Sequence, residues 1–377
     1  MGQFTEDLNR KLLLTEKKRY HRDQFNTYMN TFEWENVEDA KRIGLFLGAN
    51  KSLFYFPFIS RAYNLLSVTI ASVAAANRYQ SKYKILSSEY GLMAAFINFF
   101  NILEFVPKGV AGFFARWIVK EDNKSEMQHQ FAKHAAKYGS GLETIPFYDH
   151  DYHRMRSELS VAYQSAKTNQ SLTLSDRLTY FVMSTEWWMR AWVSRPLQWL
   201  YHQPDNIVPP TTDIIVRYRV QDAENEVQAR KSFQDKLNEI KTNAKVDVVH
   251  DHVYSKPKNP NKNYISTYAL LSAPRYRDFI NTTKTLDAAK MEIKKIAGND
   301  NIQVKCEIDA GSNDNLIEAR GAISKISSAK FLYQYGDSIN PYRRTCLFDV
   351  PVKKVQKTVN ELDKAHDDVK VSFIHNF

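Results

Sequence analysis

The densest group of side chains that could do chemistry lies in FYDHDYHRMRSE, residues 147–158. On a helix, Asp149 and His153 would share one face four residues apart, and His150 would lie beside Arg154. A carboxylate and an imidazole at this spacing can bind a divalent metal ion. A metal site needs a third ligand, and neither an HExxH motif nor a second carboxylate-rich motif supplies one. Asp149, His150 and His153 are therefore weak metal-ligand candidates, and a capped helix start with solvated charges is the competing interpretation.

Two other pairs of reactive residue types are present. On a strand, His250 and His252 of VVHDHVY would point to one face, again without a third ligand. Cys306 and Cys346 are 40 residues apart, which fits neither a disulfide framework nor a zinc knuckle and favours a reducing compartment. The sequence thus identifies no catalytic residue, and we expect no cofactor.

The composition predicts a folded chain of two domains. The chain has 377 residues, of which 43% are apolar and 25% charged, and its net charge is +10. The first residues, MGQFTEDLNRKLLL, contain no apolar run of signal-peptide length. We therefore expect a basic protein that is not secreted through a cleaved signal peptide.

The most apolar part of the chain is LMAAFINFFNILEFVPKGVAGFFARWI, residues 92–118. Residues 62–77 form a second uncharged run, and neither run is a clean membrane span, which needs about 18 consecutive apolar residues. Within residues 92–118 the polar residues are spaced 3, 3 and 4 apart, so a helix would align them in one narrow stripe. Pro107 should kink or end that helix. A helix of this kind suits either a bundle core or the lipid interface. The stripe consists of Asn98, Asn101, Glu104 and Lys108.

Basic residues surround these apolar runs. Residues 51–140 hold eleven Lys and Arg against five Asp and Glu, the largest local excess in the chain. Positive charge beside apolar residues is typical of a surface that meets anionic lipid. The predicted membrane-binding residues are Phe99, Phe100, Phe113, Phe114 and Trp117, which would insert, and Arg61, Arg78, Arg116 and Lys120, which would meet phosphates.

A further helix is predicted in LSDRLTYFVMSTEWWMRAWVSRPLQWLY, residues 174–201, with Ser175 as its cap and Asp176 in its first turn. Four of the six tryptophans lie between residues 187 and 199, interleaved with Arg190 and Arg195. Trp and Arg together are typical of an interfacial belt, but equally of a large core or a partner interface.

The pattern changes after the proline-rich segment HQPDNIVPPTTD, residues 202–213. Strand-like and helix-like segments then alternate three times, which indicates ferredoxin-like βαβ units. We therefore predict an α+β protein: an all-α domain over 1–205 with amphipathic, apolar helices, a linker over 206–212, and an α+β domain of repeated βαβ units over 213–377.

The C-terminal half also permits an RNA-binding interpretation, because such sheets can stack bases on aromatic side chains. This half carries little excess charge and lacks the motif of RNA-recognition sheets, so nucleic acid ranks below the other interpretations. The candidate residues are Tyr218, Tyr268, Phe331, Tyr333 and Tyr335, with Arg217, Arg219, Arg343 and Arg344.

Together these patterns favour a membrane-associated binding or scaffold protein over an enzyme. It would attach to anionic membrane lipids, as a peripheral protein or a membrane hairpin on the cytoplasmic side, and contact a protein partner through its α+β domain. The alternative is a soluble metal-dependent enzyme with a site at Asp149, His150 and His153; the third interpretation is the RNA-binding protein.

Overall fold

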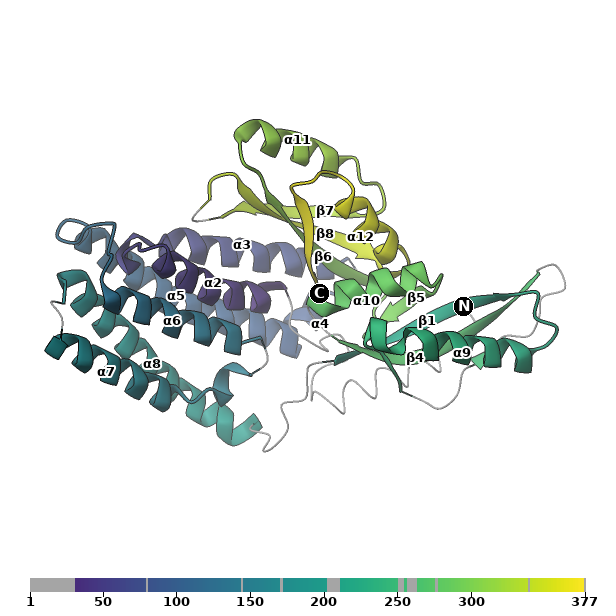
Figure 1. Cartoon of the computed structure of the whole chain (residues 1–377), viewed down its shortest axis with the longest axis horizontal. Helices are drawn as coiled ribbons and strands as arrows, with labels where there is room; N and C mark the ends of the chain where they lie inside the picture. The colour runs from purple at the N-terminus through teal and green to yellow at the C-terminus, as the bar shows by residue number, and fades with distance from the viewer. Residues whose placement is uncertain are drawn as a thin grey trace. The chain divides into compact units, whose positions relative to one another are not determined.

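The computed structural model describes residues 31–78, 81–143, 145–169, 172–201, 211–249, 254–255, 263–274, 277–337 and 340–375. Helices dominate up to residue 201, and antiparallel strands with helices between them follow (Figure 1). This mixture of helix and antiparallel sheet agrees with the predicted α+β class. Residues 206–210 of the predicted linker, and the pair His250 and His252, lie outside the described residues.

Two compact units can be distinguished among the described residues. One, the helical unit, comprises residues 32–67 and 94–201; the other, the sheet unit, comprises residues 68–93 and 211–375. The elements of the first part of the chain are α2 (Thr31–Gly48), η1 (Leu53–Tyr55), α3 (Phe58–Ala76), α4 (Lys82–Leu86), α5 (Glu89–Ala115), α6 (Glu126–Gly141), η2 (Phe147–Asp149), α7 (Tyr152–Asn169) and α8 (Leu174–Tyr201). Helices α3 and α5 contribute residues to both units.

Close helix packing shapes the helical unit. At Gly44 of α2, a Cβ atom would lie 2.8 Å from the backbone nitrogen of Ala136 in α6. At Gly139 of α6, it would lie 2.8 Å from the backbone nitrogen of Lys41. Because real Cβ contacts are longer, α2 and α6 can approach this closely only with glycine at these positions.

The cap of helix α8 lies two residues earlier than predicted, at Thr173 instead of Ser175. Thr173 Oγ1 accepts a hydrogen bond from the backbone N–H of Asp176, and the Asp176 carboxylate accepts one from the backbone N–H of Thr173. This reciprocal arrangement is a capping box. The predicted cap, Ser175, is instead buried, with its hydroxyl 2.9 Å from that of Ser52.

The sheet unit contains two sheets with a similar order of elements. Each runs strand, helix, strands, helix and strand; the first sheet has three strands between its two helices and the second has two. The first sheet has the order β2-β4-β1-β5, with β3 also paired to β4, and the second has the order β7-β8-β6-β9. The first comprises β1 (Thr211–Gln221), α9 (Glu226–Ala244), β2 (Asp247–Val248), β3 (Tyr254–Ser255), β4 (Tyr264–Pro274), α10 (Arg277–Ala288) and β5 (Glu292–Ile296). The second comprises β6 (Asn301–Asp309), α11 (Asn313–Ser324), β7 (Lys330–Gly336), β8 (Arg343–Pro351), η3 (Val352–Lys354), α12 (Val355–Asp363) and β9 (Val369–His375).

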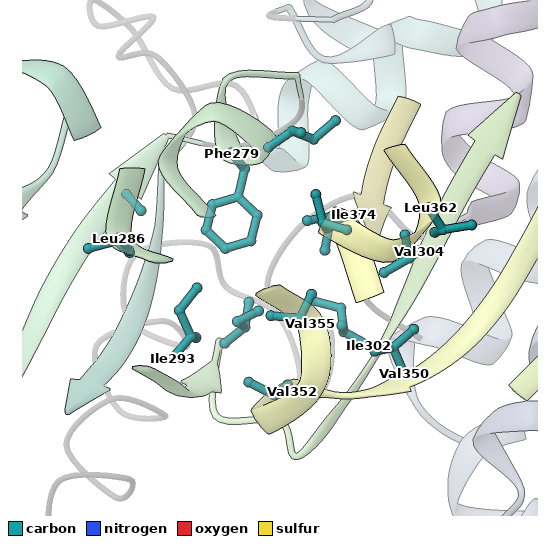
Figure 2. Packing of buried hydrophobic residues seen from close by; sticks show 14 of the residues in the cluster. Phe279, Leu286, Ile293, Ile302, Val304, Val350, Val352, Val355, Leu362 and Ile374 are labelled. Carbon is teal, nitrogen blue, oxygen red and sulfur yellow. The ribbon is translucent and has the colours of Figure 1, made fainter. Parts of the chain in front are cut away.

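One apolar core joins the two sheets. Helix α10 contacts β4 and β5 of the first sheet, and also α12 and β9 of the second. Figure 2 shows its residues Phe279 and Leu286 in the same cluster as Val304 of β6 and Ile374 of β9. Alternation along the strands directs every second side chain into this core. The opposite face of the second sheet packs Leu347 and Tyr335 against Val68 of α3.

Candidate functional site

Helix α5 continues through Pro107, so of the two expected outcomes, a kink or an end, the helix does not end there. A proline inside a helix removes one backbone donor. The residues on either side are held by packing and charge: Phe105 is buried, and Lys108 forms two ion pairs. The helix extends to Ala115, so most of the apolar stretch lies in one helix.

The polar stripe of α5 faces the interior of the helical unit. Asn98 and Asn101 are buried, and the Asn98 amide donates to the backbone oxygen of Ala94 at 2.8 Å. Glu104 and Lys108 are also largely buried, with 17% and 11% of their side chains exposed. The helix therefore turns its few polar groups inward.

The apolar side of α5 faces outward. Trp117 and Ile118, just beyond the helix end, are 76% and 66% exposed. Phe113, Phe114 and Trp117 pack against one another, with ring centroids 5.5 to 6.1 Å apart; Phe114 meets both other rings edge to face. Phe100, also predicted to insert, is half-buried against Phe99. This inverts the usual polarity of a helix on a water-facing surface. The outward α5 residues, between 37% and 58% exposed, are Phe99, Ile102, Leu103, Val106, Val110, Phe113 and Phe114.

Helix α8 shows the same inverted arrangement. Its inward side carries the polar pair Glu186 and Arg190 beside the buried ring of Trp187. Its outward side carries large apolar residues spaced 3, 4 or 7 apart, which places them on one face. These residues and their exposed fractions are Phe181 (67%), Trp188 (53%), Met189 (42%), Trp192 (68%) and Trp199 (84%).

Four charged side chains connect α5 to α8 in a closed ring. Lys108 Nζ lies 2.7 Å from Glu104 and 2.6 Å from Glu186. Arg190 lies 2.6 Å from Glu104 and 2.9 Å from Glu186. Because residue 104 meets 190 while residue 108 meets 186, the two helices run antiparallel. The ring contains two positive and two negative charges, so its net charge is zero.

Arg190 extends this ring to two tyrosines. Its guanidinium donates to the Tyr138 hydroxyl at 2.7 Å, and the Tyr152 hydroxyl lies 3.3 Å from that of Tyr138. Burial raises the pKa of Tyr138 to about 12, so this phenol stays protonated at neutral pH. The adjoining cavity measures about 30 Å³, far below the roughly 300 Å³ of small-molecule sites. The ring therefore fits a structural role better than acid–base catalysis.

The predicted basic residues have different surroundings. Arg116 and Lys120 are exposed beside the aromatic cluster, although Arg116 Nε donates to the Phe54 carbonyl. Arg78, in the sheet unit, is 37% exposed and pairs with Asp349 at 3.2 Å. Arg61 is only 1% exposed and lies 2.6 Å from the Asp39 carboxylate. A guanidinium enclosed in this way cannot meet lipid phosphates, so we exclude Arg61 from the candidate surface.

The predicted metal-binding cluster is divided between two elements. Asp149 ends the short η2, whereas His153 lies in α7, so the expected four-residue spacing on one helix is absent. His153 is exposed, while His150 is buried against Tyr138. Burial lowers the pKa of His150 to about 4. Within the residues that the structure describes, no group of three or more His, Cys, Asp or Glu side chains could hold a metal ion.

Most aromatic candidates for RNA binding are enclosed. Tyr218 stacks on Phe233 of α9 at 5.5 Å, and Tyr268 and Tyr335 are buried. Phe331 remains 48% exposed, and Tyr333 is half-buried against Tyr335. The charged candidates are engaged in pairs or backbone contacts: Arg217 and Arg219 with Glu292, Arg343 with Asp309, and Arg344 with the Pro341 carbonyl.

Sequence reasoning missed Glu186 and Arg190 as the α8 partners of Lys108 and Glu104. The signal was present, since Glu186 and Arg190 are four residues apart in a helix. Helices α3 and α5 are long and apolar enough to cross a membrane by length and composition alone. Only 44% of the apolar window of α3, and 28% of that of α5, is buried inside the fold.

Known proteins add little to this description. No family model matches the chain, and no curated protein matches it. Among solved structures, the crystal structure of an unknown protein from Galdieria sulphuraria is similar over 44% of this chain and 99% of that chain. The identity is 14% and the TM-score 0.16, a likeness too slight to carry an argument about fold or function.

Proposed function

We propose that the protein attaches to anionic membrane surfaces through the apolar outer faces of α5 and α8 and the aromatic cluster Phe113, Phe114 and Trp117. The observation that carries this proposal is the inverted polarity of α5, whose polar stripe is buried while its phenylalanines are exposed. Such a helix is stable where its outer face meets an apolar phase.

Lipid is a better partner for this surface than water. Moving apolar surface out of water lowers the free energy of the bound state by about 25 cal/mol per Å². This amounts to roughly 1.5–3 kcal/mol for each large side chain that becomes fully buried. Several exposed Phe and Trp side chains together therefore provide a large driving force. Trp in addition favours the headgroup level, where its ring is apolar and its N–H can still bond.

The charges near the aromatic cluster favour anionic lipid. Arg116, Lys120 and Lys124 are exposed close to Trp117 in sequence. Each Lys or Arg near an anionic bilayer contributes about 1 kcal/mol of attraction. The neutral ring of Glu104, Lys108, Glu186 and Arg190 supports the same orientation, because it leaves no uncompensated charge beneath the apolar faces.

For the C-terminal half, we propose two ferredoxin-like units that contact a protein partner and so make the whole chain a scaffold. The order β2-β4-β1-β5, and the matching order β7-β8-β6-β9, support these units. The second follows the β-α-β-β-α-β pattern, and the first follows it when the short strands β2 and β3, which both pair with β4, count as one position. We retain the division into a helical domain over 1–205 and an α+β domain over 213–377, and the cytoplasmic side of the membrane, as parts of this proposal.

Flotation of the purified chain with neutral and anionic liposomes, at low and high salt, tests the attachment. We expect co-flotation with anionic vesicles that weakens as salt rises, because salt screens the basic residues. Two variants define the surface: Phe113→Glu with Trp117→Glu removes the aromatic cluster, and Arg116→Glu with Lys120→Glu reverses the charge. Both should lose most of the flotation while retaining the circular dichroism spectrum of the parent chain.

Matched controls carry the same changes elsewhere. Val227→Glu with Ile317→Glu places acid at positions 75% and 59% exposed on α9 and α11. Lys231→Glu with Lys325→Glu reverses two exposed charges of the sheet unit. Both controls should float like the parent. A monodisperse parent chain that never floats would reject membrane attachment.

A further inference from the structure

Cys306 of β6 and Cys346 of β8 lie directly opposite each other in the second sheet. The register between these strands runs without a shift from Asn301↔Pro351 to Asp309↔Arg343, so the pairing is fixed on both sides. Opposite residues of antiparallel strands have Cα atoms about 4.5–5.5 Å apart, and a disulfide spans about 4.4–6.8 Å. Two cysteines that are distant in sequence therefore lie within bridging distance.

The two thiols also point into the same environment. Both are free and fully buried, in the core cluster that contains Val304 and Phe348. The two side chains are hydrogen-bonded to each other, which raises the pKa of Cys306 and lowers the pKa of Cys346. Cys346 is therefore the more acidic sulfur of the pair, and Cys306 lies beside it as a thiol.

We propose that Cys306 and Cys346 form a site of reversible oxidation, at which a peroxide converts the two thiols into one intramolecular disulfide. With hydrogen peroxide, the Cys346 thiolate attacks one peroxide oxygen, the O–O bond breaks, and a sulfenic acid and a hydroxide form; the hydroxide takes up the proton that Cys346 released and becomes the first water. The Cys306 sulfur then attacks the sulfenic sulfur, its proton leaves with the hydroxyl as a second water, and the S–S bond forms. Two thiols are oxidised by two electrons while one peroxide is reduced to two waters.

The position of the pair determines how the reaction proceeds. Strands β8 and β6 are the two inner strands of the order β7-β8-β6-β9, so neither cysteine lies at a sheet edge. With both side chains fully buried, an oxidant reaches them when the sheet opens locally. Oxidation should therefore be slow in the native chain and faster in mild urea. Once formed, the bond closes a long loop and should raise the urea concentration at the unfolding midpoint.

Treatment of the full chain with hydrogen peroxide in mild urea tests the site. We expect the intact mass to fall by two hydrogens, both alkylatable thiols to disappear together, and a peptide joining Cys306 to Cys346 to appear after digestion. Dithiothreitol should restore both thiols. Two thiols that persist after oxidation, or that gain oxygen independently, would overturn the proposal.

Single variants separate pairing from simple reactivity. In Cys306→Ala the remaining Cys346 cannot form the internal bridge, so its mass should increase by oxygen atoms or by a mixed disulfide. Cys346→Ala should behave likewise at Cys306. The disulfide of the oxidised parent chain should protect both sulfurs from further reaction with peroxide. If the remaining cysteine of a single variant gains no oxygen either, the disulfide is not the cause of that protection and the proposal fails. Circular dichroism checks that each variant is folded.

Discussion

Lys108 of α5 and Glu186 of α8 form an ion pair of 2.6 Å whose two side chains are only 11% and 12% exposed. The same lysine also pairs with Glu104, and Arg190 completes the ring. Buried charges of this kind are stable only in combination, because the attraction between opposite charges offsets the free-energy cost of removing both from water. The ring therefore makes the polar stripe of α5 compatible with an interior position.

Removing Lys108 should destabilise the chain strongly. In Lys108→Ala, two carboxylates lose one of their two partners in a poorly hydrated site, and the free energy of unfolding should fall by about 3–5 kcal/mol. Urea unfolding followed by circular dichroism measures this. Arg154→Ala is the control, since Arg154 is 71% exposed and its pair with Glu158 should contribute less than about 1 kcal/mol. Equal losses in both variants would contradict the structural role of the ring.

Arg61 and Arg116 should respond to mutation in opposite ways. Arg61 is enclosed by Glu35 and Asp39, so Arg61→Ala leaves buried carboxylates and should cost about 3 kcal/mol or more of unfolding free energy. Arg116→Ala, at an exposed position, should change stability by less than about 1 kcal/mol but weaken liposome flotation. Thermal unfolding and flotation of both variants check this. A stable Arg61→Ala chain that no longer floats would return Arg61 to the lipid-binding surface.

Acid should destabilise the chain through His150. Burial lowers the pKa of His150 from 6.5 to about 4. The unfolded state therefore binds a proton below about pH 6.5, while the folded state does not until about pH 4. The stability that His150 contributes is fully present above pH 6.5 and is lost as the pH falls towards 4, by about 3 kcal/mol at most.

Urea unfolding at pH 7 and pH 5 measures this loss. His150→Asn should reduce the difference between the two pH values, because an amide does not titrate in this range. His153→Gln is the matched control: His153 is exposed, so its replacement should leave the difference as in the parent chain. A parent chain with equal stability at the two pH values would contradict the buried, neutral state of His150.

The periodicity of the sequence predicted the helical and sheet-forming parts of the chain, because it reports which faces of an element are apolar. It could not predict which side of α5 faces inward. A thin polar line on an apolar helix fits two orientations, and the deciding partners, Glu186 and Arg190, lie about 80 residues later. The proline signal likewise left a kink and an end open, and the helix continues past Pro107.

Strand register is absent from the sequence for a similar reason. The spacing of Cys306 and Cys346 argued against a framework of disulfides, and nothing in 40 residues of chain reveals that the two are opposite each other. Likewise, Asp149 and His153 look like neighbours on one helix until the chain turns between η2 and α7. Pairs formed across elements depend on tertiary packing, which single-sequence patterns do not encode.

The tryptophans of α8 allow membrane contact to be detected without labels. Trp192 and Trp199 are 68% and 84% exposed, whereas Trp34 and Trp187 are buried. In the free chain, acrylamide should therefore quench the fluorescence of the exposed tryptophans and leave that of the buried tryptophans. Vesicles with brominated acyl chains should then quench the exposed tryptophans, because these rings move from water to the lipid interface. In Trp192→Ser with Trp199→Ser the brominated-lipid quenching should fall but not vanish, because Trp117 and Trp188 are also exposed, while the fluorescence of the buried rings persists. Unchanged emission of the parent chain with saturating anionic vesicles would mean that this face of α8 never meets lipid.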